Sequence, residues 1–331
     1  MGFLYASTLP DMNMNLQNNI QSAHPSHKGP NITAHWRKFL HSQNAGYLFV
    51  APSILFLLFF TVYPLGRGVV MSMTEVSRKG EIGKWIGFAN WPILLQDEKF
   101  LAAVTRSLKF STYGVVGALL LGVVLALLLN MAWLSPRTTN FLRGVAVLPW
   151  MFATAVAALM WGLLLHRDGL INSWLLLTGA IEKPIQFVGN PRLALFSLAM
   201  VFVWRVTPFI MVMVLASLKS IPIELYEAAS VDGASKWHSF WRITLPLIMP
   251  LLLTLAILTF VWGISQFDLI RIITGGGPID STQVVSYYIY RVGFLTQNWS
   301  YGATISVAVF IVNLFFALIY LYLSARSKPW E

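Results

Sequence analysis

Long apolar runs separated by short polar connections dominate the chain from about residue 47 to residue 325. About 20 apolar residues, each rising about 1.5 Å, cross a bilayer core of roughly 30 Å. Six segments satisfy this rule, and the second, third, fifth and sixth contain no Asp, Glu, Lys, Arg or His. They are Tyr47–Val70, Phe110–Met131, Val145–Leu165, Leu193–Leu218, Leu247–Phe267 and Tyr301–Leu323. Because backbone polar groups in lipid must be satisfied within the segment, we predict an all-α polytopic membrane protein of six transmembrane helices.

The residues before the first apolar run form a separate region. Residues 1–45 are rich in Asn, Gln, His, Ser and Pro, and no apolar block precedes a small-residue cleavage site. This pattern does not match a signal peptide. We expect a disordered cytoplasmic tail over 1–45 and one transmembrane domain over 46–327.

Composition supports the membrane assignment. Hydrophobic residues make up 56% of the chain and charged residues 11%, with a mean hydropathy of +0.66. Soluble proteins contain about 25% charged residues. The net charge is +10, and the basic residues lie mostly between apolar runs and at the termini. We interpret these residues as topology determinants and lipid headgroup contacts, and we expect no nucleic acid partner. The absence of cysteine from the sequence excludes disulfides and cysteine-ligated zinc.

Charge indicates the orientation weakly. The tail, the 132–143 and 218–248 loops and the C-terminus hold 10 Lys and Arg, and the other three loops hold 11. The positive-inside rule weights short loops, and residues 135–143 contain two Arg and no acid. Both termini are therefore expected on the cytoplasmic side. Aromatic residues near helix ends are interpreted as the interfacial belt of membrane proteins; they are Tyr47, Trp133, Trp150, Trp161, Trp174 and Tyr301.

The loop at 218–248, between the fourth and fifth predicted helices, has the strongest local signals. Pro222 suits the first turn of a helix, and Glu224 favours the same end through the helix dipole. Gly233 gives the backbone the freedom for a tight reversal. A second short helix from Ala234 to about Arg242 would stop before Pro246. The sequence thus predicts a helix-turn-helix hairpin.

This loop resembles the EAA motif of ATP-binding-cassette importer permeases. That motif reads Glu-Ala-Ala, three residues, Gly, nine residues, Ile, one residue, Leu-Pro. Its positions are met by Glu227, Ala228, Ala229, Gly233, Ile243, Leu245 and Pro246, and Asp232 lies beside the glycine. The segments 141–150, 204–209, 267–270 and 274–278 are similar to the maltose-type sugar permeases of the same family.

The resemblance implies a division of labour. Residues 218–248, called here the coupling loop, would dock into a cytoplasmic ATPase subunit that binds ATP and Mg, while this chain binds no cofactor. Two such ATPase subunits, a second permease that makes a heterodimer and a periplasmic solute-binding protein would complete an importer in a bacterial inner membrane. The Gly275–Pro278 segment, which we interpret as a flexible turn, would face the binding protein.

The sequence agrees that ATP hydrolysis happens elsewhere. No Gly-x-x-x-x-Gly-Lys-[Ser/Thr] occurs. We also find no metal-ligand spacing and no catalytic set, which places the chain among transport subunits and not enzymes.

Two helix faces are candidates for the substrate path. Sugars are bound by aromatic faces and hydroxyl-bonding groups in a mostly apolar pocket. Phe202, Arg205 and Phe209 share one face of the fourth helix, and the fifth carries a second set on one face. That set is Thr259, Trp262, Gly263 and Gln266. The resemblance places both sets at the sugar-binding positions of the family; the alternative is a packed helix interface.

Arg205 leaves two roles open. An arginine in mid-membrane faces a partner or a water-filled path. It could bind the acid group of an oligosaccharide such as an alginate or pectin fragment, or it could pair with Asp268 as a structural residue.

Two other classes of membrane protein are weighed. An ion-coupled secondary transporter would show inverted repeats and midplane acids or histidines, and neither is apparent. An intramembrane enzyme would need a serine with a histidine in reach. His166 and Asp168 lie at a helix end with no such serine.

Overall fold

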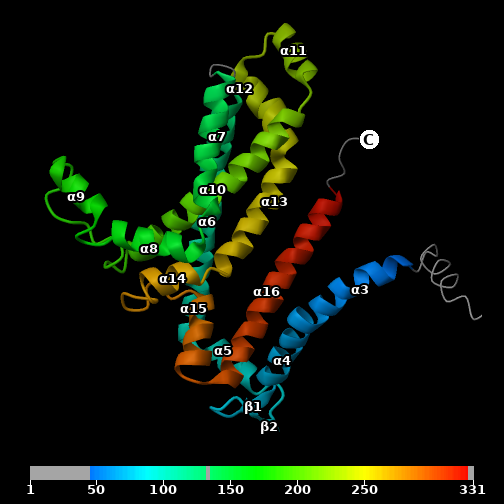
Figure 1. Cartoon of the computed structure of the whole chain (residues 1–331), viewed down its shortest axis with the longest axis vertical. Coiled ribbons are helices and arrows are strands. Elements are labelled where there is room, and N and C mark those ends of the chain that lie inside the picture. Colours follow the sequence, from blue (N-terminus) through cyan, green and yellow to red (C-terminus); the bar gives the residue numbers. More distant parts are fainter. Residues whose placement is uncertain (1–44, 132–134, 327–331) are drawn as a thin grey trace, which may run out of the picture. The chain divides into compact units, whose positions relative to one another are not determined.

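The computed structural model describes residues 45–131 and 135–326. The expected tail, 1–45, lies outside them except for its last residue, and so does Trp133. The chain forms two compact units, Met1–Pro64 and Leu65–Glu331, and each is treated by itself below. Figure 1 names the helices and strands.

The described part of the first unit is helical throughout. Helix α3 (Ala45–Leu57) continues through a π-helical turn, η1 (Leu58–Val62), into α4 (Tyr63–Ser72). Phe59 stacks on Tyr63 with ring centroids 6.1 Å apart. The stretch Phe49–Ser72 is long and apolar enough to cross a membrane, in agreement with the first predicted span.

Two long helices form the core of the second unit, α6 (Glu98–Asn130) and α10 (Ala194–Ser220). Small residues on α6 allow the close approach that membrane helices use. A Cβ at Gly114 would lie 2.7 Å from the Phe202 ring, and one at Gly122 would lie 2.5 Å from Ile210 Cγ2. Helix α6 begins 12 residues before the predicted Phe110 because Asp97 caps it, accepting from the Lys99 and Phe100 amides.

The fifth predicted span departs from expectation at its start. Helix α12 (Lys236–Ser239) passes through the π-helical turn η2 (Phe240–Thr244) into α13 (Leu245–Ile264). The prediction of a second short helix that stops before Pro246 is therefore wrong. Pro246 lies in the first turn of α13, directly after the π-helical turn, and the helix runs on through it.

The third predicted span is also wrong as a single helix. Helix α7 (Pro136–Met151) and α8 (Thr154–Leu164) meet at an angle of 96°. Phe152 and Ala153 have ψ angles of 133° and 137°, outside the helical region. Among the described residues five helices are long and apolar enough to cross a membrane, and the count reaches six when this bent pair is taken as one span.

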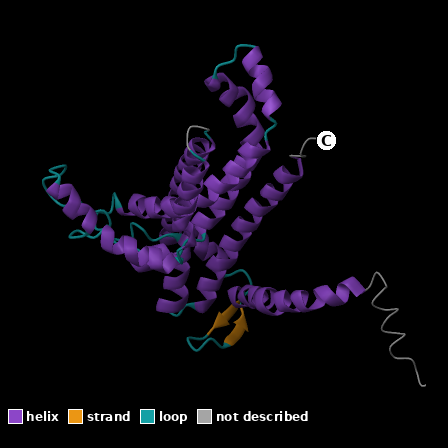
Figure 2. Cartoon of the chain, turned by 45° about the horizontal axis from the view of Figure 1, so that its top comes forward, coloured by secondary structure: helices purple, strands orange, loops and turns teal. Residues whose placement is uncertain are grey.

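A β-hairpin lies at the end of the second unit opposite α11 (Ile223–Val231), as Figures 1 and 2 show. Strands β1 (Thr74–Val76) and β2 (Ile82–Trp85) form an antiparallel hairpin in which Thr74 pairs with Trp85. The remaining elements are α5 (Asn90–Gln96), α9 (Leu170–Leu177), α14 (Asp268–Ile273), α15 (Val285–Tyr290), the π-helical turn η3 (Arg291–Leu295) and α16 (Trp299–Arg326).

Side-chain hydrogen bonds join distant segments at that end. Asp97 Oδ2 accepts from the hydroxyls of Tyr288 at 2.6 Å and Tyr301 at 2.7 Å. Ser300 Oγ donates to the Thr74 carbonyl oxygen at 2.7 Å and accepts from Asn90 Nδ2. We call Asp97 with its two tyrosines the Asp97 clasp. It ties the start of α6 to α15 and α16.

Candidate functional site

Helix α11, the first half of the coupling loop, ends on a Schellman motif. The Ala234 amide donates to the Ala229 carbonyl at 2.9 Å and the Gly233 amide to the Ser230 carbonyl at 3.1 Å. Gly233 has φ +74°, the left-handed conformation that costs an L-residue about 1–2 kcal/mol. No atom lies within 4 Å of a Cβ built there. Backbone conformation, and not space, therefore calls for glycine at this position.

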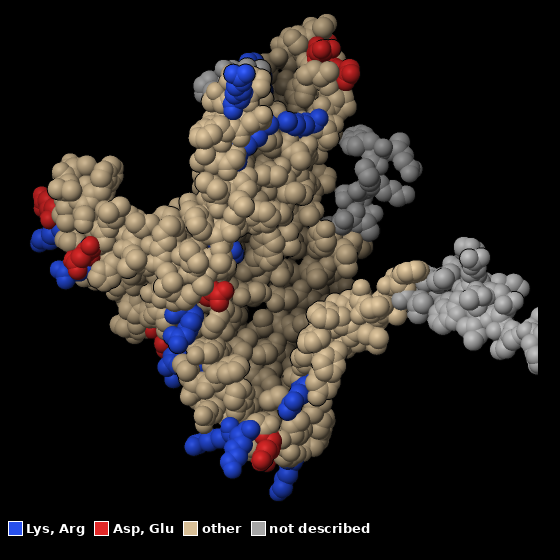
Figure 3. All heavy atoms as spheres, in the orientation of Figure 1, with Lys and Arg blue, Asp and Glu red and all other residues tan. Residues whose placement is uncertain are grey.

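The motif residues of α11 are open to solvent. Helix α11 contains no buried residue, and Glu227, Ala228, Asp232 and Gly233 are exposed while Ala229 is half-buried. Apolar side chains are exposed beside them, with Val231 at 88% and Ile223 at 62%. Figure 3 shows acidic side chains gathered over α11 at the upper end of the second unit. Helix α11 therefore leaves most of its surface open, apart from the side that carries Tyr226 and Ala229.

The second half of the motif lies where the loop enters α13. Ile243 and Leu245 are half-buried, and Pro246 is exposed. Between them Thr244 is buried, and its Oγ1 lies 2.8 Å from the Tyr226 hydroxyl of α11. Sequence reasoning missed this pair, because neither residue is a fixed position of the motif. It joins α11 to the helix that enters the membrane.

Three rings join α7, α10 and α13 in an aromatic cluster. The Phe209 ring lies 5.5 Å from that of Trp150 and 5.3 Å from that of Trp262. Trp204, on α10, packs against Phe152 and Trp161 at 6.3 and 5.4 Å. Trp150 and Trp161, interpreted from sequence as belt residues, thus contact α10. Phe209 and Trp262 were predicted as path residues, and Trp150 joins them because α7 packs against α10.

Arg205 lies one turn before Phe209 on α10. Its side chain is half-buried, and its buried Nε has no hydrogen-bond partner. The Asp268 carboxylate interacts with it electrostatically. Among the described residues, however, the two side chains do not approach within the 4.0 Å of a direct ion pair. The guanidinium is therefore incompletely satisfied.

The other predicted path residues lie inside helix contacts. Phe202 is fully buried against Phe110, with ring centroids 5.4 Å apart. A Cβ at Gly263 would lie 2.6 Å from Ser111 Oγ, so α13 touches α6 there. Thr259 is fully buried and Gln266 is 7% exposed. For Phe202, Thr259 and Gly263 the packed-interface alternative describes this conformation.

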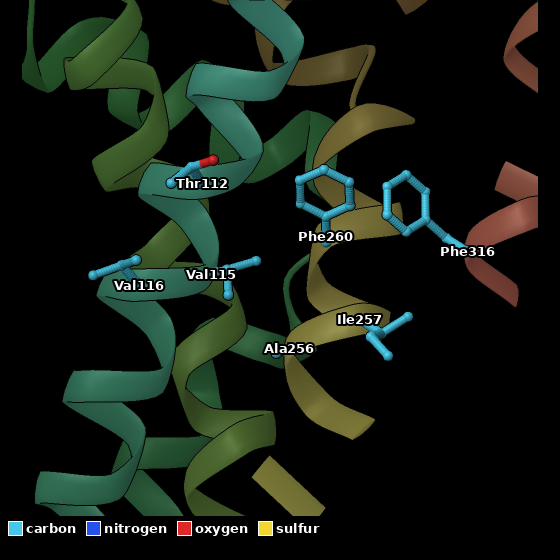
Figure 4. A pocket seen from close by; sticks show the side chains of 7 residues that line it. All are labelled: Thr112, Val115, Val116, Ala256, Ile257, Phe260 and Phe316. Carbon is cyan, nitrogen blue, oxygen red and sulfur yellow. The ribbon is translucent and has the colours of Figure 1, made fainter. Parts of the chain in front are cut away.

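A groove of about 250 Å³ is lined by apolar side chains and offers few hydrogen-bonding groups to a sugar (Figure 4). Its one hydroxyl, that of Thr112, donates to the Leu108 carbonyl at 2.8 Å. The groove lies between α6, α13 and α16 and is lined by Thr112, Val115, Val116, Ala256, Ile257, Phe260 and Phe316.

Hydrogen bonds close the glycine turn before α15. Thr282 Oγ1 lies 2.7 Å from both the Gly277 carbonyl oxygen and Thr274 Oγ1. Gly276, at φ +84°, packs so tightly on Tyr287 that a Cβ would lie 2.6 Å from its ring. The turn is built by these contacts, in contrast to the flexible segment expected from its glycines. No cluster of three metal-ligating side chains occurs within 45–131 and 135–326.

Electrostatics are most marked at the Asp97 clasp. Burial alone would raise the pKa of Asp97, but hydrogen bonds from Tyr288, Tyr301 and the Phe100 and Lys99 amides outweigh it and hold that pKa below its ordinary value. Burial, with the hydrogen bond to Asp97, raises the pKa of Tyr288. The clasp is thus a carboxylate accepting from neutral phenols.

Comparison with known proteins gives one consistent result. A family model described as "Binding-protein-dependent transport system inner membrane component" matches residues 118–329. The trehalose/maltose transport system permease protein MalF of Thermococcus litoralis is 31% identical over 283 residues, 83% of this chain and 92% of that protein. The sulfoquinovosyl glycerol transport system permease protein SmoG of Agrobacterium fabrum is 31% identical over 277 residues, 83% of this chain and 88% of that protein.

Among solved structures, a chain of a bacterial ABC transporter involved in the import of the acidic polysaccharide alginate superposes with a TM-score of 0.76. It is 24% identical, and the match covers 89% of this chain and 100% of that one. At this identity the likeness shows a shared fold.

Proposed function

The chain belongs to the family of binding-protein-dependent transport system inner membrane components, and on that premise we propose that it is a permease subunit of an ATP-driven importer of a sugar or oligosaccharide. The observation that carries the proposal is the likeness to sugar transport permeases over more than four fifths of the chain. A helix with no buried residue, presented by an ordered reversal at Gly233, supports it.

The proposal gives each surface a role. Helix α11 docks into a cytoplasmic ATPase subunit, and Glu227, Ala228, Ala229, Asp232 and Gly233 form the contact. The Tyr226–Thr244 pair then passes movement of α11 to α13. ATP and Mg bind the partner ATPase, so this chain performs no hydrolysis of its own.

The remaining partners follow from the family's plan. A second permease, two ATPase subunits and a periplasmic solute-binding protein complete the importer, with both termini of this chain in the cytoplasm of a bacterium. Half of a transport path with polar groups such as Arg205 cannot be left to lipid. A heterodimer with a second permease is therefore favoured over a lone subunit.

The substrate path runs past the aromatic cluster. Phe209 and Trp262 offer ring faces, and Arg205 offers an incompletely satisfied guanidinium. Phe202, Thr259, Gly263 and Gln266 are buried here and join the path only in a conformation that opens these helix contacts. A guanidinium can hold a carboxylate with two hydrogen bonds, and a structural relative imports an acidic polysaccharide. We therefore include acidic oligosaccharides such as alginate or pectin fragments among the substrates.

An ion-coupled secondary transporter gains no support from the relatives. The test is ATPase activity of the purified complex with its binding protein, measured against a panel of neutral and acidic oligosaccharides. We expect at least one sugar to stimulate hydrolysis severalfold. Stimulation by none of them, with amino acids or peptides active instead, would contradict the sugar assignment.

Arg205→Met, compared with the parent on acidic and neutral sugars, tests the role of the guanidinium. Selective loss of the acidic response supports substrate binding. Equal loss for both classes, or no loss, would make Arg205 a structural residue that pairs with Asp268.

A further inference from the structure

A groove of about 760 Å³ lies beside the coupling loop, between the C-terminal half of α6 and the segment that leads into α13. Its walls are apolar along most of their length, with Leu119, Val123 and Leu127 from α6 facing Leu252 from α13. Polar side chains occur at one end, where Asn130 and Lys236 line it. No Asp or Glu is among the lining residues.

The length of the groove matches one leaflet of a bilayer. Its lining along α6 runs from Leu119 to Met131, which at about 1.5 Å per residue is about 18 Å. Half of a hydrocarbon core of roughly 30 Å is about 15 Å. The apolar wall therefore reaches from the middle of the membrane to the headgroups on the coupling-loop side.

The polar end of the groove has the composition of a membrane interface. Trp237 and Trp241 are 70% and 50% exposed, and their rings contact each other at 5.6 Å. Lys236 and Arg242 flank them, and both are exposed. Tryptophans with neighbouring cations on a membrane protein lie at the headgroup level, and basic clusters there attract anionic lipids.

We propose that this groove binds one anionic phospholipid from the leaflet on the coupling-loop side. An acyl chain lies along Leu119, Val123 and Leu127, and the headgroup phosphate pairs with the Lys236 ammonium. A membrane helix from another subunit would have no such need for a cation at one end of an otherwise apolar groove. The amphiphilic gradient and the absence of acids from the lining both fit a lipid.

The site bears on the coupling loop, because Tyr226 and Thr244 also line the groove. An occupying lipid contacts the hydrogen-bonded pair that joins α11 to α13. The binding itself does not depend on which substrate the importer carries.

The test uses the complete transporter in nanodiscs of phosphatidylethanolamine with a phosphatidylglycerol that carries a photoreactive group on its acyl chain. After irradiation, mass spectrometry locates the adducts. We expect them on residues 119–127 and 237–245. Val123→Trp, which fills the groove, should lower these adducts at least threefold, and Lys236→Gln should lower the preference for phosphatidylglycerol over phosphatidylethanolamine by a similar factor.

Two matched variants control the test. Leu128→Trp adds the same ring to an exposed position of α6 outside the groove, and Lys219→Gln removes a cation from the last turn of α10. Both should leave the adducts unchanged. Adducts spread evenly over the exposed surface of α6, or no adducts on residues 119–127 and 237–245, would overturn the proposal. If Val123→Trp fails to insert, competition by unreactive phosphatidylglycerol at the parent groove decides the question, and no competition would also overturn it.

Discussion

The two ends of the second unit are built in opposite ways. At the Asp97 clasp, the carboxylate accepts hydrogen bonds from Tyr288 and Tyr301, which lie 191 and 204 residues further along the chain. Farther along α6, Ser107 Oγ accepts a hydrogen bond from the buried Val285 amide at 2.8 Å. At the coupling loop, α11 has no buried residue, and Tyr226 bonds it to the start of α13. One end is held by the chain's own contacts, and the other leaves most of α11 exposed.

This difference matters for how force enters the molecule. A movable element needs few internal contacts, and the elements that move in coupled systems come from the less stable parts of a fold. We expect the Asp97 clasp to hold its end of the second unit in place while α11 moves. The predictions below change one end at a time.

The largest effect is expected at Gly233. Gly233→Val forces a β-branched residue to φ +74°, so the reversal after α11 is lost and transport should fall at least tenfold, while the protein still inserts. Gly233→Asn, which tolerates this conformation, is the matched control and should keep most activity. Uptake in proteoliposomes measures both. Equal transport activity of the two variants would show that transport does not depend on the left-handed turn at residue 233.

Charge reversal at Glu227 tests the same end by another route. Glu227→Lys keeps the helix but changes the charge offered to the partner, and we expect transport to fall about as far as in Gly233→Val. The exposed Glu224→Lys on the same helix is the comparison. If neither change affects uptake, α11 is not a docking surface.

At the other end, Asp97→Ala removes the acceptor of the two tyrosine hydrogen bonds and of the cap bonds from the Lys99 and Phe100 amides. Such bonds contribute roughly 1.5–3 kcal/mol each when well formed, and partial exposure lowers this, so a loss of about 3 kcal/mol in stability is expected. Thermal unfolding of the purified protein measures it. Glu98→Ala, at the next and exposed residue, should change stability by less than about 0.5 kcal/mol. Similar losses in both would show that the clasp contributes little.

The clasp also predicts a dependence on pH. Hydrogen bonds lower the folded pKa of Asp97, so its contribution is complete above the unfolded value of about 3.9 and is lost as the pH falls through that value toward the folded pKa. The stability difference between the parent and Asp97→Asn should therefore be constant from pH 5 to 7 and shrink below about pH 4. A difference that grows on acidification would contradict this assignment.

The smallest effect is expected at the bond between the two halves of the loop. Tyr226→Phe removes a hydrogen bond that contributes roughly 1 kcal/mol. Transport should fall a few fold while ATPase binding is kept, since α11 still docks but is less firmly joined to α13. Thr244→Val should have the same effect, and the double variant should be no worse than either single one. Additive losses would mean that the pair does not act as a unit.

The spans could be read from hydropathy because lipid allows few alternatives to the helix. The 33 residues of α6 exceeded the prediction, since Lys99, Arg106 and Lys109 extend it beyond the apolar run. The break at Phe152 and Ala153 was missed because the run there is uniformly apolar and hydropathy does not register backbone direction. The motif gave the coupling loop, but not the π-helical turn that carries Thr244.

Other parts of the site depend on contacts that no local pattern encodes. The Asp97 clasp joins three segments of ordinary composition, and Trp150 meets Phe209 because α7 packs against α10. Helical periodicity led us to predict that Phe202, Arg205 and Phe209 line the substrate path together, because they share one face of the helix. Periodicity cannot tell a path from an interface, and Phe202 is buried against Phe110.

Cysteine cross-linking tests the central claim, that the coupling loop is completed by an ATPase subunit, most directly. The chain contains no cysteine, so a single Ala228→Cys on α11 and a matched Ala180→Cys, exposed after α9, report without background. In the assembled transporter, labelled at the introduced cysteine with a short reagent that carries a maleimide and a photoreactive group, we predict that irradiation joins Ala228→Cys to the ATPase subunit and does not join Ala180→Cys to it. Cross-linking of Ala180→Cys to the ATPase, or failure of Ala228→Cys to join it in a complex that hydrolyses ATP, would contradict the account.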